Sequence, residues 1–470
     1  IPGSFTDAVG NPDQPHSNVA SRIYNWTFDN TAPTMTITAA DAASGGNALT
    51  SGDLTNSTAA IYLTFTSSED TTDFESSDIT IANGGSIGSS FAGSGKVYTA
   101  TFAPAGGDNT NNEISVAGST FTDAAGNNNS ASNTFSWIVD TVSPTPSGNI
   151  TTSNSNSSWA KVGDQITVSV STPNDTDIAS VTITLASTGG TIPTGSATES
   201  SGTWSIEHTL LSTDLEGPLS ASFTATDQAG NTGSDSDSSS IVFDKTKPTG
   251  AITYSTPGPY KENDTATITA TFTESLTTTP KIAISGVSTI TATDMTGSGT
   301  TWTYAYTAPS GDGTETISLS VGTDAAGNEV TATPTSGATF TVDNTAPTGA
   351  ITYSSAGPYN DSDTVTITAT FNENIADSPV MQIAIAGSGT LGSVTATNMT
   401  KTSSTEYTYS YDVPHDDGTG TITLSTGTDI AGNVITAAPT NNTFTVDNTA
   451  PTGAITYSTP GPYKENDTAT

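Results

Sequence analysis

The sequence predicts an all-β protein built from tandem β-sandwich domains that are arranged end to end as a rod. The first observation is alternation: Val365, Ile367, Ala369 and Phe371 are apolar at every second position, which is typical of a strand with one buried face. The second is an aspartate-containing phrase that returns roughly every 100 residues, which is the size of one small β-sandwich. No part of the chain shows helical periodicity.

The recurring phrase is clearest as Val-Asp-Asn-Thr-Ala-Pro at residues 342–347. Proline fixes its own φ and disfavours helix at the residue before it, so the chain must run extended here, as a linker does. The phrase returns at Asp447 and, in looser form, at Asp244, Asp140 and Asp29. The predicted limits are 1–28 for the last hairpin of a preceding domain, 29–139, 140–243 (divergent), 244–342 and 343–446 for four domains, and 447–470 for the first strands of a following domain.

Strands are predicted in order within each domain, separated by Gly and Asn clusters that suit hairpin turns. In the domain at 244–342 the strands, lettered A to G in order, cover 251–255, 265–273, 281–285, 289–294, 301–307, 316–321 and 338–342. In the domain at 29–139 they cover 35–39, 60–66, 79–83, 97–103, 113–121 and 133–139, and in the divergent domain 165–170, 181–185, 203–208, 220–226 and 239–243.

The alternation also predicts which residues form the cores. In the domain at 244–342 the inward residues are Ile268, Phe272, Ile282, Ile284, Trp302 or Tyr304, Ile317, Leu319, Val321, Phe340 and Val342. In the next domain they are Ile367, Phe371, Ile383, Ile385, Tyr407, Tyr409, Ile422, Leu424, Phe444 and Val446.

The sequence also repeats over a unit longer than one domain. Residues 451–470 are identical to residues 248–267, while the start of the domain at 343–446 differs from both at several positions. The unit of duplication is therefore predicted to be a pair of domains, which points to a long rod or a lattice building block. The chain reads as a segment of a longer protein.

Charge and composition restrict the possible partners. The chain has 9 Lys and Arg against 46 Asp and Glu, a formal net charge of −37, and the acids stand singly in the turns. Such a surface argues against nucleic acid or anionic lipid as a partner, and no direct membrane insertion is expected in this segment. Cysteine is absent, so metal or array packing is expected to replace disulfides as the stabilising device.

Three phrases carry a family resemblance: the linker at 342–347, Thr-Asp-Ala-Ala-Gly-Asn at 323–328 and Phe-Asn-Glu at 371–373. With them the chain resembles the tandem immunoglobulin-like (Ig-like) repeats of prokaryotic surface proteins, which include archaeal S-layer proteins and giant calcium-dependent adhesins. The resemblance implies an extracellular location at the cell surface or cell wall. It implies calcium at the domain junctions, and it implies other copies of the chain, neighbouring surface proteins or glycans as partners.

Sandwich topology predicts where the acids lie. If the strands alternate in direction, the B–C, D–E and F–G loops lie near the preceding linker, and the A–B, C–D and E–F loops lie near the next one. Calcium accepts six to eight oxygens in irregular geometry, whereas the absence of Cys and the scarcity of His disfavour zinc and copper. For the Asp343 joint the predicted calcium ligands are Glu373, Asp429 and Asn433 from the following domain and Glu262, Asp264 and Asp312 from the preceding one.

The other joints repeat the prediction with their own residues. The candidates are Asp29 with Asp123; Asp140 with Asp53, Asp108, Asp175, Asp177 and Asp227; Asp244 with Glu274 and Asp324; and Asp447 with Asp361, Asp363, Asp416 and Asp417. Two alternatives stand beside this. Asp-x-Ala-Gly-Asn is a good turn sequence without any metal, and Lys245 and Lys247 could neutralise the acids at the Asp244 joint directly.

The predicted function is structural: an S-layer lattice or an adhesin stalk, with the domains made rigid by calcium at their junctions. The alternative is an adhesive binding module that recognises glycan or a partner cell, and a third hypothesis, from charge alone, is an acidic surface that concentrates cations. An enzyme is not expected, because the chain shows no catalytic triad arrangement, nucleophile elbow or phosphate loop, and its acids recur as repeats do.

Overall fold

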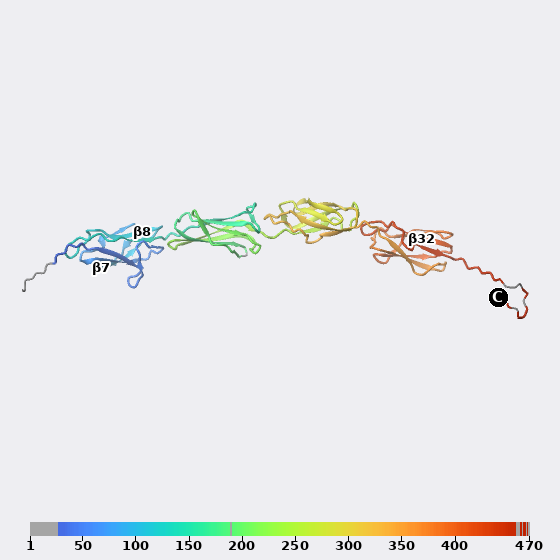
Figure 1. Ribbon diagram of the computed structural model, residues 1–470, viewed down its shortest axis with the longest axis horizontal. Helices are drawn as coiled ribbons and strands as arrows, with labels where there is room; N and C mark the ends of the chain where they lie inside the picture. The colour runs from blue at the N-terminus through green and yellow to red at the C-terminus, as the bar shows by residue number, and fades with distance from the viewer. Residues whose placement is uncertain (1–26, 189, 457–460, 463, 467, 469–470) are drawn as a thin grey trace, which may run out of the picture. The chain divides into compact units, whose positions relative to one another are not determined.

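The computed structural model describes residues 27–188, 190–456, 461–462, 464–466 and 468. The chain divides into two compact units, residues 1–243 and 244–470. Each unit contains two β-sandwiches, and Figure 1 shows every sandwich as two facing layers of strands. Within the described ranges, no helix combines the length and the hydropathy needed to cross a membrane.

The first unit holds the first and second sandwiches. The first pairs a sheet of order β2-β1-β4-β7-β6 with one of order β3-β9-β8-β5, and the second pairs β10-β12-β16-β15 with β11-β18-β17-β13-β14. The strands of the first are β1 (Met35–Ala40), β2 (Ala48–Leu49), β3 (Leu54–Thr55), β4 (Ile61–Thr71), β5 (Ile79–Ala82), β6 (Ser86–Ile87), β7 (Ala92–Ala103), β8 (Thr110–Val116) and β9 (Phe135–Val139), with a single 3₁₀ turn, η2 (Ser76–Asp78), before β5. Those of the second are β10 (Ser147–Thr152), β11 (Trp159–Ala160), β12 (Gln165–Ser171), β13 (Ile178–Ser187), β14 (Gly190–Ile192), β15 (Thr198–Ser200), β16 (Thr203–Thr209), β17 (Gly217–Asp227) and β18 (Thr232–Phe243).

The second unit holds the third and fourth sandwiches. Their sheets have the orders β19-β20-β23 with β22-β21-β24-β25, and β26-β27-β31-β30 with β29-β28-β32-β33. The strands of the third are β19 (Gly250–Tyr254), β20 (Thr265–Leu276), β21 (Lys281–Ser285), β22 (Thr289–Asp294), β23 (Thr296–Thr307), β24 (Gly313–Ser320) and β25 (Thr339–Val342). Those of the fourth are β26 (Gly349–Tyr353), β27 (Thr364–Phe371), β28 (Gln382–Gly387), β29 (Val394–Asn398), β30 (Thr400–Lys401), β31 (Glu406–Asp412), β32 (Gly418–Ser425) and β33 (Thr443–Val446).

Each sandwich has its own hydrophobic core, made by the inward residues of its two sheets. In β20 the pattern is regular: Ile268, Ala270 and Phe272 are buried, while the threonines between them point outward. Threonine suits the outer face because its branched Cβ favours the extended backbone and its hydroxyl remains in water. One predicted core residue is wrong, because Val321 is 44% exposed and has a positive φ of 71° just beyond the end of β24.

Strand A changes sheets in the third and fourth sandwiches. In the fourth, β26 pairs antiparallel with β27 and ends at Tyr353, and Tyr359 then pairs in parallel with Val446 on β33 of the other sheet. The sequence predicts a kink in strand A at Pro257–Tyr260, and the third sandwich changes sheets there in the same way, since Tyr260 pairs with Val342. This change leaves the chain between the two pairings outside both sheets.

The two terminal predictions fall largely outside this description. For the predicted hairpin at 1–28, residues 1–26 lie outside the described residues. Residues 451–456 carry no strand, and most of the remainder up to 470 also lies outside them. The domain limits given above therefore stay predictions.

Candidate metal centres

The F–G loop of each sandwich is folded around one aspartate. In the fourth sandwich the Asp429 carboxylate accepts hydrogen bonds from the backbone N–H of Asn433 at 2.8 Å and from its side-chain amide at 2.8 Å. Gly432 takes a φ of 88°, which glycine adopts without strain. The turn chemistry predicted for Asp-x-Ala-Gly-Asn is therefore present, and it leaves Asp429 only 1% exposed.

The same asparagine holds the linker. Its side-chain amide also donates to the backbone carbonyl of the linker aspartate, at 2.8 Å between Asn433 Nδ2 and Asp343 O. This clamp occurs in all four sandwiches, as Asn127 on Asp29, Asn231 on Asp140, Asn328 on Asp244 and Asn433 on Asp343. The predicted ligand Asn433 thus acts as a clamp through its amide nitrogen, and a role for its oxygen as a ligand stays a prediction.

The clamp brings three carboxylates together in three of the four sandwiches. One oxygen from each of Asp343, Glu373 and Asp429 lies within 4.8 Å of the other two. The three side chains come from the linker, the residues after strand β27 and the F–G loop, so they are distant in sequence. The complete groups are Asp29, Glu69 and Asp123; Asp244, Glu274 and Asp324; and Asp343, Glu373 and Asp429. Together they are called the carboxylate triads below.

In two of the triads, burial and neighbouring charges disfavour the ionised form of the glutamate. Burial, followed by the negative charges of Asp343, Asp429 and Asp312, raises the pKa of Glu373. Burial, followed by a hydrogen bond with Asp29 and the charges of Asp29 and Asp123, raises the pKa of Glu69. Each glutamate is therefore held where its ionised form is disfavoured, and a cation placed between the three oxygens would relieve that repulsion.

Glu69 is the ligand candidate that sequence reasoning missed. In the other two triads the glutamate stands two residues after a phenylalanine, at Phe272-Thr273-Glu274 and Phe371-Asn372-Glu373. In the first sandwich two extra residues separate Phe65 from Glu69, and β4 continues to Thr71 rather than ending near residue 66. Glu69 could have been recognised as an acid near the end of strand B, but its distance from Phe65 is longer than the Phe-x-Glu spacing of the other two sandwiches.

The second sandwich uses different acids. It lacks the glutamate, but Asp140 and Asp227 are each 1% exposed. Burial raises the pKa of Asp140, and the charges of Asp227, Asp177 and Asp108 add to the shift. Burial and the neighbouring Asp177 raise the pKa of Asp175 to about 6. The aspartates of this joint therefore act on one another's pKa, but among the described residues they do not form a carboxylate triad, and their role as metal ligands stays a prediction.

The acids predicted from the preceding domain have other partners. Asp312 accepts the backbone N–H of Asn344 at 2.5 Å and the hydroxyl of Thr345 at 2.5 Å. Asp264 caps its own turn by accepting the N–H of Lys261. Glu262 meets the linker through its backbone N–H, which donates to the Asn344 side chain. Of these three acids, only Asp312 fastens the linker through its carboxylate, and its charge also raises the pKa of Glu373 in the triad.

The Asp447 joint repeats this arrangement on its preceding side. Asp417 accepts the N–H of Asn448 at 2.5 Å and the hydroxyl of Thr449 at 2.7 Å, as Asp312 does one joint earlier. The other predicted acids bind locally: the Asp361 carboxylate meets His415, Asp363 accepts the N–H of Asn360, and Asp416 offers its backbone carbonyl to Asn448. Asp447 itself accepts the N–H of Thr449.

Acidification is expected to release these linker contacts. Hydrogen bonds from Thr345 and Asn344 lower the pKa of Asp312, and those from Asn448 and Thr449 lower that of Asp417. A carboxylate whose pKa is lower in the folded than in the unfolded chain stabilises the fold at pH values above its unfolded-state pKa. That stabilisation is lost as the pH falls through the folded-state pKa. We expect the Asn344 and Asn448 amides to exchange faster with solvent, relative to unstructured amides, as the pH falls below about 4, the ordinary aspartate pKa. NMR-detected exchange would contradict this if Asp312→Asn left the Asn344 protection and its pH dependence unchanged.

The triads fit calcium by the chemistry of their donors. All three side chains are carboxylates, and hard oxygen ligands in irregular geometry are what Ca²⁺ accepts. No histidine or cysteine belongs to any of the three groups, so a zinc or copper site would lack its usual ligands. Carboxylates from three separate segments would tie the linker to strand B and to the F–G loop if they shared one ion.

Comparison with known proteins gives one family match and several structures of similar fold. Residues 29–139 match the family profile of the bacterial Ig-like domain, and no curated protein matches the chain. A tetra-tandem repeat from the extending region of a large adhesion protein is 19% identical, over 89% of this chain and 100% of that chain, with a TM-score of 0.35. A Ca²⁺-stabilised adhesin of an Antarctic bacterium is 20% identical, over 89% and 100%, with a TM-score of 0.36. The titin I-band fragment I67–I69 is 12% identical, over 63% and 100%, with a TM-score of 0.28.

Scores this low carry no argument about function. The family match covers one sandwich, and the paired sheets of the other three have the same all-β architecture. Residues 29–139 therefore belong to the bacterial Ig-like domain family, and the chain is a tandem array of Ig-like β-sandwiches.

Proposed function

We propose that the chain is a structural, non-catalytic segment of a cell-surface protein, in which calcium bound at the linkers makes the joints between Ig-like domains rigid. The observation that carries the proposal is the recurrence of the carboxylate triad, with the same three sources, in three of the four sandwiches. A metal that bound only once would suit a catalytic site, whereas repetition at three linkers suits a mechanical role.

The geometry of the linker supports a stiffening role. The linker aspartate is fixed from the following sandwich through the asparagine clamp, and the residues after it are fixed from the preceding sandwich by Asp312 or Asp417. A cation in the triad would complete the attachment on the following side. Since the triad belongs to one sandwich and its own linker, calcium would order the linker first, and the acids of the preceding sandwich would then limit its bending.

Calcium titration tests the proposal directly. Isothermal titration of the full chain is expected to show at least one bound Ca²⁺ for each of the three triads, with Mg²⁺ much weaker because it demands regular octahedral geometry. The triple variant Glu69→Gln, Glu274→Gln and Glu373→Gln should lose these sites. A control with the same net charge, Glu75→Gln, Glu199→Gln and Glu406→Gln, should keep them. Equal calcium binding by the two triple variants would contradict the proposal.

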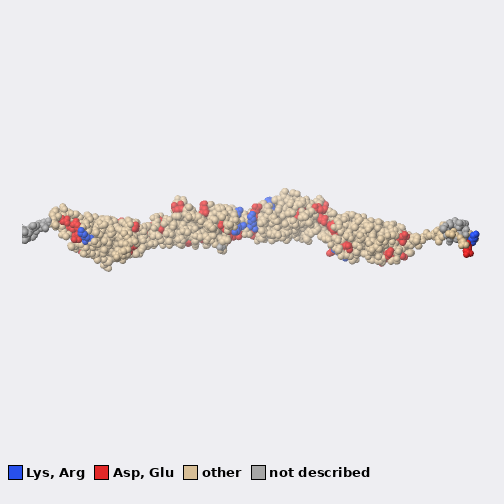
Figure 2. All heavy atoms as spheres, turned by 60° about the horizontal axis from the view of Figure 1, so that its bottom comes forward, with Lys and Arg blue, Asp and Glu red and all other residues tan. Residues whose placement is uncertain are grey.

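Two structural roles remain within the proposal, an S-layer lattice and an adhesin stalk. The charge distribution is compatible with both, since Figure 2 shows the acidic side chains in small groups while uncharged residues form most of the visible surface. Purified chain that assembles into ordered sheets on addition of calcium would favour the lattice. A chain that remains soluble and becomes more extended in small-angle scattering would favour the stalk.

A further inference from the structure

A gap opens along the edge of β33 in the fourth sandwich. Strand A leaves its sheet after Tyr353 and meets β33 again only at Tyr359, where the Tyr359 N–H donates to Thr445 O and the Asp447 N–H donates to Tyr359 O. Before the gap, the Ile351 N–H donates to Thr440 O. Between these two contacts, the edge of β33 faces a pocket of about 500 Å³ rather than a neighbouring strand.

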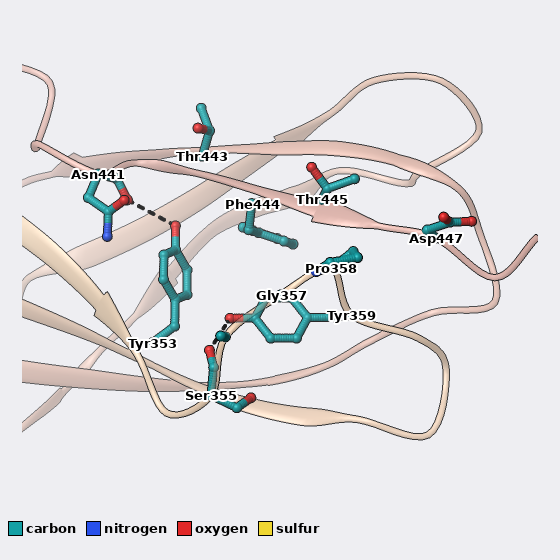
Figure 3. A pocket seen from close by; sticks show the side chains of 11 residues that line it. Tyr353, Ser355, Gly357, Pro358, Tyr359, Asn441, Thr443, Phe444, Thr445 and Asp447 are labelled. Atoms are coloured by element: carbon teal, nitrogen blue, oxygen red, sulfur yellow. Dashed lines mark hydrogen bonds between the residues drawn. The ribbon is translucent and has the colours of Figure 1, made fainter.

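Aromatic rings form the inner wall of this pocket. The ring centroids of Tyr353 and Phe444 are 5.9 Å apart, and those of Tyr359 and Phe444 are 6.1 Å apart. Figure 3 shows the three rings together beneath β33, with the chain around Gly357 and Pro358 opposite the strand. Both tyrosine hydroxyls are already bonded, to the carbonyls of Asn441 and Ser355. Tyr359 and Phe444 are only 3% and 7% exposed, so the half-buried ring of Tyr353 is the main aromatic surface that the pocket presents.

The backbone of β33 offers a hydrogen-bonding pair on the other side. Asn442 O accepts from Ile422 on β32, and Phe444 is opposite Gly420, so the even-numbered residues bond to β32. In a strand the alternate residues point the other way, as the bond from Tyr359 to Thr445 O confirms. Thr443 therefore directs its N–H and C=O into the gap, and none of the described residues bonds to that pair.

We propose that this pocket binds an N-acetylated amino sugar. The acetamido carbonyl accepts the outward N–H of Thr443, and a neighbouring ring hydroxyl donates to the Thr443 C=O. The methyl group and the apolar face of the sugar ring pack on the half-buried ring of Tyr353, since aromatic rings provide flat contact area. Hydroxyls and a carboxylate at the rim, from Ser355, Thr445 and Asp447, receive the remaining sugar hydroxyls.

The shape of the gap favours such a ligand over a β-strand. A peptide added to a sheet edge needs a run of free backbone groups, but here the pairings of Ala350 with Thr440 and of Tyr359 with Val446 close the gap at both ends. A compact ligand with one amide and several hydroxyls uses the single outward pair and the rim together. A pocket of this size that combines an aromatic side chain with several polar groups suits a small polar ligand.

The third sandwich repeats the main features. Tyr254, Tyr260 and Phe340 lie together, with centroids 5.3 Å and 5.6 Å from that of Phe340. Thr339 occupies the position of Thr443, since Ala338 O accepts from Ile317 and Thr341 O accepts from Tyr260. The test must therefore remove the outward N–H in both sandwiches.

The experiment is a ligand-observed NMR titration of the full chain with N-acetylglucosamine. Binding is expected to be at least about tenfold tighter than that of glucose, with and without calcium, because the pocket does not use the triads. The double variant Thr339→Pro and Thr443→Pro should lose this preference while keeping its fold, since proline is tolerated at an edge strand when its missing N–H faced away from the sheet.

Several outcomes would overturn the proposal. These are no binding of N-acetylglucosamine, equal binding of glucose, or unchanged binding by the proline double variant with an intact circular dichroism spectrum. If the proline variant fails to fold, Tyr254→Ala with Tyr353→Ala provides the second test and must lose the same preference. A capped dipeptide that binds as well as the sugar and competes with it would show an edge for peptides instead, and would also overturn it.

Discussion

Replacing Glu373 by glutamine is expected to shift the stability of the fourth sandwich in opposite directions with and without calcium. In chelator the variant should be more stable than the native chain, because it removes one of three carboxylates whose oxygens lie within 4.8 Å of one another. In saturating calcium it should be less stable, because the triad has lost a ligand and the ion no longer stabilises the folded state. Such a crossover distinguishes a metal site from an ordinary turn.

The calcium-dependent part is the larger effect. A ligand that binds only the folded state stabilises it by about 2.7 kcal/mol at a hundredfold excess over Kd, and the variant should lose most of that. Hydrogen exchange measured by mass spectrometry on peptides of the fourth sandwich gives a local readout in the full chain. Glu406→Gln, at the start of β31 and outside the triads, is the matched control. A Glu373→Gln variant that responds to calcium as this control does would refute the site.

The pH dependence of the stability of the fourth sandwich should also differ with and without calcium. The folded-state pKa of Glu373 is raised, so in chelator its contribution favours the folded state at low pH and is lost as pH rises through that pKa. Asp312 works in the opposite direction, because its pKa is lowered and its stabilising effect is lost on acidification. Calcium should remove the first dependence and leave the second, since Asp312 is occupied by the linker and not by the ion.

The alternation of the sequence predicted the long strands and most of the core. It was wrong for residues 117–121, which follow the end of β8 at Val116, and it did not predict short strands such as β2 and β3. The predicted ranges 281–285 and 289–294 coincide with β21 and β22, because each is bounded by turn residues and presents one apolar face. Trp302, left open against Tyr304, is the buried one at 7% exposure. The prediction that Val321 belongs to the core was wrong because periodicity assumes that the strand continues, whereas the chain turns there with positive φ.

The candidate site could be predicted only in part. Topology alone places the linker, the end of strand B and the F–G loop at one pole, which brought Asp343, Glu373 and Asp429 together correctly. It could not show that the linker asparagine and threonine compete for the acids of the preceding sandwich, as Asn344 and Thr345 do for Asp312. Hydrogen bonds of this kind depend on side-chain geometry, which spacing along the chain does not specify.

The second prediction concerns Glu315 and the stability of the core of the third sandwich. Its carboxylate is fully buried, and Oε1 accepts the N–H of Ser288 at 2.8 Å, its hydroxyl at 2.5 Å and the hydroxyl of Tyr306 at 3.2 Å. Burial, followed by the charge of Glu315, raises the pKa of Tyr306. The carboxylate thus brings three donors together. The Tyr306 hydroxyl is buried and Ser288 is half-buried, while Oε2 of Glu315 has no partner among the described residues.

Glu315→Ala is therefore expected to destabilise the third sandwich by about 1 to 3 kcal/mol, since the buried Tyr306 hydroxyl loses its acceptor and one such donor costs roughly that much. Thr316→Ala, at the next and exposed position of β24, should change stability by less than about 0.5 kcal/mol. Urea unfolding followed through a fluorinated Trp302 reports on this core, because Trp302 belongs to it. Glu315→Gln retains an acceptor oxygen and should fall between the two. If Glu315→Ala were as stable as Thr316→Ala, water would have to satisfy Ser288 and Tyr306, and the buried carboxylate would have no structural role that the fold requires.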